Sequence, residues 1–477
     1  MPERQGFHMS PARFREEARL FADWIAGYWE RVGDLPVFPD TRPGATLDAL
    51  PTAPPREGEP MADMLRDMDE VLLPNFVHWQ SPNFFSYFAG NTSGPSVLGE
   101  MVSSALSASC FQWACNPAAT ELEMRVMDWL VEMLGITGRF TFASGGGGVI
   151  QDSSSTATLC AIVAARERAE GPLARKTAYL TSESHSSVSK GLRMAGFEPG
   201  NVRTVAVDDK LAMRPDELER MVAEDIAAGL TPCIVVGTLG TTSSTAIDPL
   251  PAMGVITSRR NIWLHVDAAM AGAAMICPEY RRHGAGLELA DSFSFNPHKW
   301  LFTNLDCCCM FVADGAQYTA AFANDPEYLA NRFSDSGEVV DYRNWGITFG
   351  RRMRALKLWF VIRHYGVEGL RHHLEAHIKL ARELAEWIAA DNDFELAADV
   401  PFNLVCFRHR GGEELNRELL QALNASGGMH LTHTRLAGVY TLRMHIGQTS
   451  TERRHVVAAW ELVQKTAVEL QRKGVAQ

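Results

Sequence analysis

Lys299 stands out because it follows an apolar strand. The segment DSFSFNPHKW (291–300) alternates apolar and polar residues as a strand does and then presents Lys299. The chain has eight lysines, and we expect the other seven in polar helices or loops. A partly desolvated lysine has a lowered amine pKa, which frees the nucleophile needed for a Schiff base. Lys299 is therefore a candidate covalent anchor, although an isolated lysine at a strand end usually reaches water.

A second apolar strand, IWLHVDAAMAG (262–272), ends in an acid. Ligands of open α/β sheets bind at the carboxyl ends of parallel strands, where Asp267 is expected. The small residues after it, including Ala269, would let a flat ligand approach the backbone. Pyridoxal 5′-phosphate needs an acid that keeps its ring nitrogen protonated. Asp267 could equally cap the next segment, but together with Lys299 it is interpreted as the ring partner of this cofactor.

A glycine run forms the third piece, in TFASGGGGVIQDSSSTATLCAIVAAR (141–166). Four glycines lead through Ser153, Ser154 and Ser155 into an alanine-rich helix. We expect backbone N–H groups, hydroxyls and the positive helix end to converge there on a phosphate. Taken alone, a glycine run is more often a flexible loop, and this one fits neither the Walker nor the dinucleotide pattern. The interpretation as a phosphate site is supported by Asp267 and Lys299, which follow in the same predicted domain.

These three pieces, in this order, resemble the pyridoxal-phosphate-dependent group II amino acid decarboxylases. The resemblance extends through most of the chain, in SPNFFSYF (81–88), NPAATELEMRVMDWL (116–130), SHSSVSKG (184–191), GTLGTTSSTAIDPL (237–250), DYRNWGITFGRRMRALKLWF (341–360) and HIGQTST (445–451). The NPHKW motif resembles the aromatic-L-amino-acid decarboxylase branch. The resemblance implies that an aromatic L-amino acid (tryptophan, 5-hydroxytryptophan, DOPA, tyrosine or phenylalanine) becomes the amine and CO2. An aromatic aldehyde synthase or an aminotransferase on the same fold is the alternative.

The resemblance also implies roles for individual residues. His185 would stack on the cofactor ring, and Tyr328 would protonate Cα from a lid loop. Without the resemblance, His185 would be a capped loop histidine and Tyr328 a surface residue. Gly350 would reach the cofactor from a neighbouring subunit. The implied cofactor contacts are Ser154, Ser155, His185, Thr242, Asp267, Ala269, Asn296, His298, Lys299 and Gly350.

Four aromatic residues form the expected substrate wall: Trp79, Tyr87, Phe88 and Phe111. Such a cluster suits a flat aromatic ligand but is as often interface core. Ala89 and Gly90 stand where animal relatives carry a Pro-Thr pair, which removes a hydroxyl donor. Our hypothesis is that tryptophan-like substrates are accepted at least as well as L-DOPA. An aminotransferase would need an arginine for the substrate carboxylate, and Arg443 is the candidate, although strand-end arginines are commonly structural.

No metal site is expected. His373 and His377 stand four apart as in zinc proteases, but Glu375 lies midway instead of adjacent to the first histidine, which favours a solvated helix face. The nine cysteines include the run 307–309, whose neighbours would point to opposite faces of a strand. Buried reduced thiols are the expected state.

The chain is predicted to be an α/β protein, because short apolar strands alternate with helices between about 93 and 360. The resemblance implies the fold of type I pyridoxal-phosphate transferases, with a mostly parallel seven-stranded sheet sandwiched by helices. The expected units are an N-terminal helical arm (1–92), a large cofactor-binding domain (93–360) and a small α+β C-terminal domain (361–477).

The N-terminal arm needs a partner surface. Residues 11–29 place apolar side chains at helical spacing, and the proline-rich stretch to about 60 is expected to be extended. The resemblance implies a homodimer with the active site at the subunit interface.

Composition limits the remaining possibilities. The 477 residues include 46% hydrophobic side chains, enough for a large core, and the net charge of −12 argues against nucleic acid and anionic membranes as partners. No signal peptide is visible, and no run approaches the ~20 apolar residues of a membrane span. We expect a cytoplasmic protein.

Overall fold

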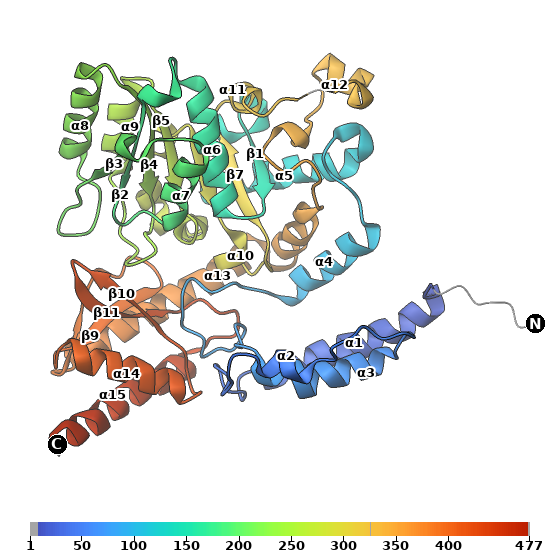
Figure 1. Cartoon of the computed structure of the whole chain (residues 1–477), viewed down its shortest axis with the longest axis vertical. Helices are drawn as coiled ribbons and strands as arrows, with labels where there is room; N and C mark the ends of the chain where they lie inside the picture. Colours follow the sequence, from blue (N-terminus) through green and yellow to red (C-terminus); the bar gives the residue numbers. More distant parts are fainter. Residues whose placement is uncertain (1–7, 325, 476–477) are drawn as a thin grey trace, which may run out of the picture.

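A seven-stranded sheet forms the centre of the molecule (Figure 1). The computed structural model describes residues 8–324 and 326–475. The strand order is β1-β7-β6-β5-β4-β2-β3. The strands β3, β2, β4, β5 and β6 run parallel, and β7 runs antiparallel between β6 and β1, so the predicted mostly parallel sheet is confirmed. The bounds are β1 (Gly147–Gln151), β2 (Lys176–Thr181), β3 (Val202–Val205), β4 (Thr231–Thr238), β5 (Trp263–Asp267), β6 (Ser292–Phe295) and β7 (Cys308–Val312).

Both faces of this sheet are buried under helices, which explains its apolar strands. Along β4, Ile234 and Val236 pack into one core cluster while Val235 packs into the other. The helices α6 (Ser154–Arg168) and α7 (Ser186–Met194) belong to the first face, and α5 (Pro117–Leu134), α8 (Pro215–Ala227) and α9 (Leu250–Ser258) supply side chains to the second.

A second, antiparallel sheet lies in the C-terminal part, in the order β10-β11-β9-β8. Its strands are β8 (Phe394–Leu396), β9 (Leu404–His409), β10 (Thr432–Leu436) and β11 (Val439–His445), with helices α14 (Glu413–Ala425) and α15 (Arg453–Val475). This is the small α+β unit that was predicted. The expected boundary at 360 falls inside the long helix α13 (Arg354–Ala390), which kinks at Gly366 (φ 63°).

The N-terminal arm projects from the body (Figure 1). The predicted amphipathic helix is confirmed as α1 (Pro11–Arg31), which Ser10 caps. The following stretch is not simply extended, because it contains α2 (Ala45–Ala49) and returns so that α3 (Met61–Asp67) contacts α1. The helices α1 and α3 thus form a helical hairpin. The indole of Trp24 in α1 donates to Asp69, which lies just after α3, at 3.1 Å and links the two sides of this hairpin.

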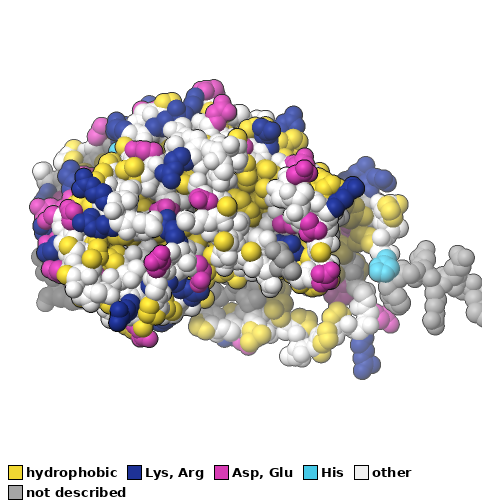
Figure 2. All heavy atoms as spheres, turned by 90° about the horizontal axis from the view of Figure 1, so that it is seen from above, with side chains coloured by type: hydrophobic (Ala, Val, Ile, Leu, Met, Phe, Trp, Pro, Cys, Tyr) yellow, Lys and Arg dark blue, Asp and Glu magenta, His cyan; other side chains and the backbone are white. Residues whose placement is uncertain are grey.

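The surface carries both signs of charge. Lys and Arg side chains are interspersed with Asp and Glu on the face seen in Figure 2. Within the described residues, no helix is both long and apolar enough to cross a membrane.

Candidate active site

Most of the candidate site residues emerge at one edge of the large sheet. Thr238 of β4 pairs with Asp267 of β5, which pairs with Ser294 of β6. Across β7, Ile150 of β1 and Phe295 of β6 both pair with Cys309, and β1 ends one residue later at Gln151. The segments that follow β1, β2, β4, β5 and β6 therefore leave the sheet at its carboxyl edge, where ligands of such sheets bind.

The acid and the lysine meet at this edge. Asp267 is only 4% exposed, and its Oδ1 accepts the N–H of Ala269 at 3.0 Å, the local bond that the capping alternative expected. The N–H of Asn296 donates to the carbonyl of Ala269 at 2.9 Å and ties the Lys299 segment to the Asp267 segment. Burial lowers the pKa of the Lys299 amine, while the Asp267 carboxylate raises it in part. The site can thus hold a neutral, nucleophilic amine.

The serine segment forms a candidate phosphate site at the start of α6. Ser153 caps this helix through the N–H of Thr156, and Ser154 and Ser155 form its first turn. The Ser154 hydroxyl donates to Asn296 Oδ1 at 2.8 Å, which connects the helix to the lysine segment. Hydroxyls and free helix N–H groups suit a phosphate.

The glycine run does not belong to this phosphate site, contrary to our expectation. Gly147 and Gly148 are the first residues of β1, and five strand residues place them roughly 16 Å from the helix start. A Cβ on Gly148 would lie 2.4 Å from Met127, and one on Gly147 would lie 2.6 Å from Trp345. These two glycines therefore serve close packing around the strand.

Two histidines carry fixed hydrogen bonds. The Nδ1 of buried His298 accepts the N–H of Cys307 at 2.9 Å, and burial, helped by Lys299, lowers the pKa of His298 to about 4. His185 caps α7 through Nδ1, which accepts the N–H of Ser187 at 3.2 Å. Its pKa is lowered by burial and by Lys299 and raised by Asp267. Because each Nδ1 accepts a backbone N–H, the hydrogen of each ring resides on Nε2.

Arg443 holds the loop that follows β4. Its guanidinium donates to the carbonyls of Thr242 (2.6 Å) and Ser243 (3.1 Å) and to the hydroxyl of Thr432 (2.9 Å). The side chain is buried in β11 and bridges the two sheets through these bonds. An arginine engaged in this way is structural, which disfavours the aminotransferase alternative. Its carbonyl partners lie about two hundred positions away in sequence, so no local pattern could reveal them.

The four wall residues separate into two groups. The rings of Trp79 and Tyr87 stack at 5.6 Å, and Phe88 lies with its ring centroid 5.6 Å from the Lys299 amine. Phe111 instead stacks with Phe349 at 4.8 Å, next to Gly350. Gly350 is exposed, and a Cβ there would meet nothing within 4 Å.

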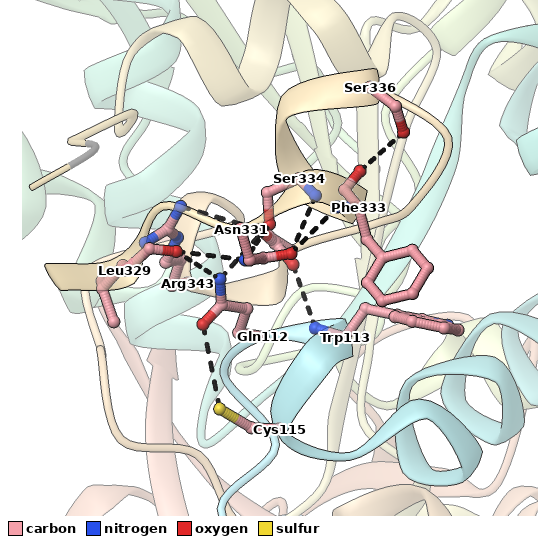
Figure 3. A network of polar contacts seen from close by, with 10 residues as sticks. Gln112, Trp113, Cys115, Leu329, Asn331, Phe333, Ser334, Ser336 and Arg343 are labelled. Carbon is pink, nitrogen blue, oxygen red and sulfur yellow. Dashed lines mark hydrogen bonds and ion pairs between the residues drawn. The ribbon is translucent and has the colours of Figure 1, made fainter. Parts of the chain in front are cut away.

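The loop that contains Tyr328 is fastened through Leu329, Asn331 and Ser334 by polar contacts that sequence reasoning missed (Figure 3). The side chain of Tyr328 is 79% exposed, while Leu329 beside it accepts a bond from Gln112 at 2.9 Å. Asp341 accepts the N–H of Trp113 at 3.0 Å and the hydroxyl of Ser334 at 2.5 Å. The loop is thus fastened to the segment that follows Phe111.

The structure bears on the predictions for the cysteines, the paired histidines and the lysines. The cysteines 307–309 are buried and free, as expected. His377 is not on a solvated face, because it is buried and accepts the indole N–H of Trp300 at 3.0 Å. Across the described ranges, no cluster of ligand residues could hold a metal ion. The expectation that the other lysines lie in polar surroundings is wrong for Lys176 and Lys357, which are buried, whereas Lys299 is half-buried, so burial does not distinguish Lys299.

Comparison with known proteins agrees with this geometry. Residues 43–410 match the model of the pyridoxal-dependent decarboxylase conserved domain. The chain is 41% identical over 474 residues to tryptophan decarboxylase TDC2 of Camptotheca acuminata, covering 96% of this chain and 95% of that protein. It is 42% identical over 479 residues to a phenylacetaldehyde synthase of Arabidopsis thaliana, covering 98% of each.

A solved structure has nearly the same fold. Oryza sativa TDC with PLP and tryptamine superposes with a TM-score of 0.95 at 38% identity, over 97% of this chain and 99% of that one. Catharanthus roseus tryptophan decarboxylase in complex with L-tryptophan gives 0.93 at 40% identity, with the same coverage.

Proposed function

The chain belongs to the pyridoxal-dependent decarboxylase family, and from this premise we propose that it converts aromatic L-amino acids to the corresponding amines and CO2. The observation that carries the proposal is the Lys299 amine, held beside buried Asp267 and against the ring of Phe88. Relatives named as tryptophan, aromatic-L-amino-acid and tyrosine decarboxylases support the substrate class.

The residues present fit pyridoxal phosphate. Asp267 is a buried carboxylate at the strand edge, Lys299 is an amine of lowered pKa, and the first turn of α6 offers hydroxyls and N–H groups to a phosphate. The cofactor supplies an electron-withdrawing ring for the bond that breaks at Cα. Further proposed contacts are Ser154, Ser155, Thr242, Ala269, Asn296 and His298.

This chain's own residues would orient the substrate and move the protons. Lys299 would bind the cofactor carbonyl, and Asp267 would hold a proton at the ring nitrogen. His185, with its hydrogen on Nε2, would lie near the leaving carboxylate and orient it perpendicular to the ring. Tyr328 would then deliver a proton to Cα after CO2 leaves, once its loop closes and excludes water.

We also propose a homodimer with the active site at its interface. Apolar side chains of α1 and of α4 (Gly94–Leu106) remain exposed: Phe14 by 50% and Leu98 by 58%. Phe111, which stacks with Phe349, and Gly350 would contact the cofactor of a second copy. Under this proposal 1–92 embraces the partner, while 93–360 binds cofactor and 361–477 is the small domain; residues 1–7 lie outside the described part.

A cytoplasmic location is proposed as well. It is supported by the cysteines, all nine of which are free in the described chain. Reduced thiols are typical of the cytosol.

The test is a panel assay of the cofactor-loaded protein. Substrates are tryptophan, 5-hydroxytryptophan, L-DOPA, tyrosine, phenylalanine, histidine and glutamate, with CO2 and the organic product followed together. Amine from the aromatic substrates alone supports the proposal, and kcat/KM for tryptophan at least equal to that for L-DOPA supports the pocket hypothesis. Aldehyde with ammonia and peroxide would favour the aldehyde synthase alternative, which the similarity to the phenylacetaldehyde synthase keeps open.

A further inference from the structure

Five stacked rings connect Phe38 with Trp79 and Tyr87 of the expected aromatic wall. The column contains Phe38, His430, Phe84, Trp79 and Tyr87, and the last three form a cluster because the Tyr87 ring also lies 6.3 Å from that of Phe84. Successive ring centroids are 5.2, 5.6, 4.8 and 5.6 Å apart, and the interplanar angles are 9°, 7°, 29° and 9°. Three separate parts of the chain therefore meet in one stack: the stretch around Phe38, the segment before α4 and the segment before β10.

His430 is the central fixed point of this column. Its ring is sandwiched between Phe38 and Phe84, its Nδ1 lies 2.5 Å from the Ser86 hydroxyl, and it is only 8% exposed. Its backbone carbonyl accepts the N–H of Phe85 at 3.0 Å, and its own N–H donates to Asn83 at 3.2 Å. Burial lowers the pKa of the imidazole, which favours the neutral ring. His430 thus holds the backbone at Asn83 and Phe85 and the side chains of Phe84 and Ser86.

The far end of the column is open. Trp79 and Tyr87 remain 42% and 49% exposed, and Tyr87 has a φ of 58°, in the left-handed region that a tyrosine rarely adopts. Such a conformation persists only where the surroundings determine it. Phe88, the next residue, contacts the Lys299 amine through its ring. Tyr87, at the end of the column, is therefore followed directly in sequence by the ring that lies against the reactive lysine.

We propose that His430 is a positioning residue for the substrate's aromatic ring. It holds Phe84, and through Phe84 the Trp79–Tyr87 pair, in the orientation that a flat side chain stacks against. His430 does not touch the reacting atoms, so it acts on binding and not on bond breaking. This inference rests on the proposed aromatic substrate class.

The test compares two substitutions in the cofactor-loaded enzyme. His430→Ala opens the stack, and we expect KM for tryptophan to rise about fivefold, the size of one lost aromatic pair, with kcat within about twofold. His430→Phe keeps a flat ring between Phe38 and Phe84, so its KM for tryptophan should stay close to the wild-type value. The dissociation constant of tryptamine, followed by cofactor absorbance, should change in parallel with KM.

A matched control lies in the same sheet. His433 of β10 stacks on Tyr440 at 4.6 Å on the exposed side, so His433→Ala removes a comparable pair and should leave KM unchanged. If His430→Ala does not fold, Ser86→Ala loosens the imidazole while keeping all five rings, and KM should rise about twofold.

The outcomes separate the two proposals. Wild-type enzyme without turnover of aromatic amino acids contradicts the proposed function and removes the basis of this inference. Active wild-type enzyme with an unchanged KM in His430→Ala, or an equal loss of kcat in His430→Ala and His430→Phe, overturns the role of His430 alone.

Discussion

Lys299 and Asp267 could be found from sequence because strand periodicity placed Asp267 at the end of β5 and Lys299 shortly after the end of β6, and parallel strands share one carboxyl edge. The glycine run was misassigned because a run of glycines fits a loop and a tightly packed strand equally well. The role of Arg443, which holds the Thr242 loop, could not be assigned from sequence. A guanidinium can bind either a substrate carboxylate or backbone carbonyls, and the sequence does not distinguish these two partners.

Tyr328→Phe tests the proton donor. Phenylalanine keeps the ring but cannot donate a proton to Cα, so we expect kcat for amine formation to fall at least tenfold. Oxygen should then compete for the unprotonated carbon, and the fraction of aldehyde product should rise. Simultaneous measurement of CO2, amine, aldehyde and peroxide gives the partition.

Glu327→Gln is the control for this substitution, because it alters the exposed neighbour in the same loop. It should keep the wild-type product ratio. Unchanged amine formation in Tyr328→Phe would exclude Tyr328 as the donor.

At the scale of elements, the strands and helices of the large sheet followed from local pattern, whereas the loops depended on partners far along the chain. The hairpin 238–248 is an example. Asp248 closes its base by accepting the N–H of Thr238 and of Met213, each at 2.7 Å, and Arg443 holds its tip. No motif marks these bonds.

Asp248 should give this hairpin a pH-dependent stability. Burial raises the pKa of its carboxyl to about 6, above the ordinary value of 3.8. Because its pKa is raised in the folded state, Asp248 contributes about 3 kcal/mol to the free energy of unfolding below pH 4, where its carboxyl is protonated. This contribution is lost as the pH rises through 6. Asp248→Asn should flatten the fall in melting temperature between pH 4 and 6.5. Asp209→Asn, on the surface nearby, should leave the wild-type profile intact; an unaltered slope in Asp248→Asn would contradict the assignment.

At the scale of the whole molecule, the amphipathic helix predicted a surface that needs a partner, but sequence could not show that the arm folds back into a hairpin. The turn depends on long-range contacts such as the bond of Trp24 to Asp69. The exposed apolar faces of α1 and α4 are the part of the molecule that a second copy would cover.

Leu98→Glu tests that surface. A charge on the exposed face of α4 should convert the proposed dimer to monomer, because a carboxylate buried in an apolar interface carries a large desolvation cost. Activity should fall with the dimer fraction, measured by sedimentation at several protein concentrations. Val468→Glu, at an exposed apolar position of α15, should remain dimeric. A monomeric wild type, or a fully active monomer, would contradict the shared site.

The bonds from Arg443 to Thr242 and Ser243 have a consequence for how the molecule melts. If the C-terminal sheet unfolded by itself, the large sheet would lose the donors to two loop carbonyls, and a guanidinium shielded from solvent would lose its acceptors. Unfolding of either sheet alone is therefore unfavourable, because it leaves polar groups of both sheets without hydrogen-bond partners. The two sheets should behave as one cooperative unit, with amide protons on both sides of the contact exchanging at a common rate.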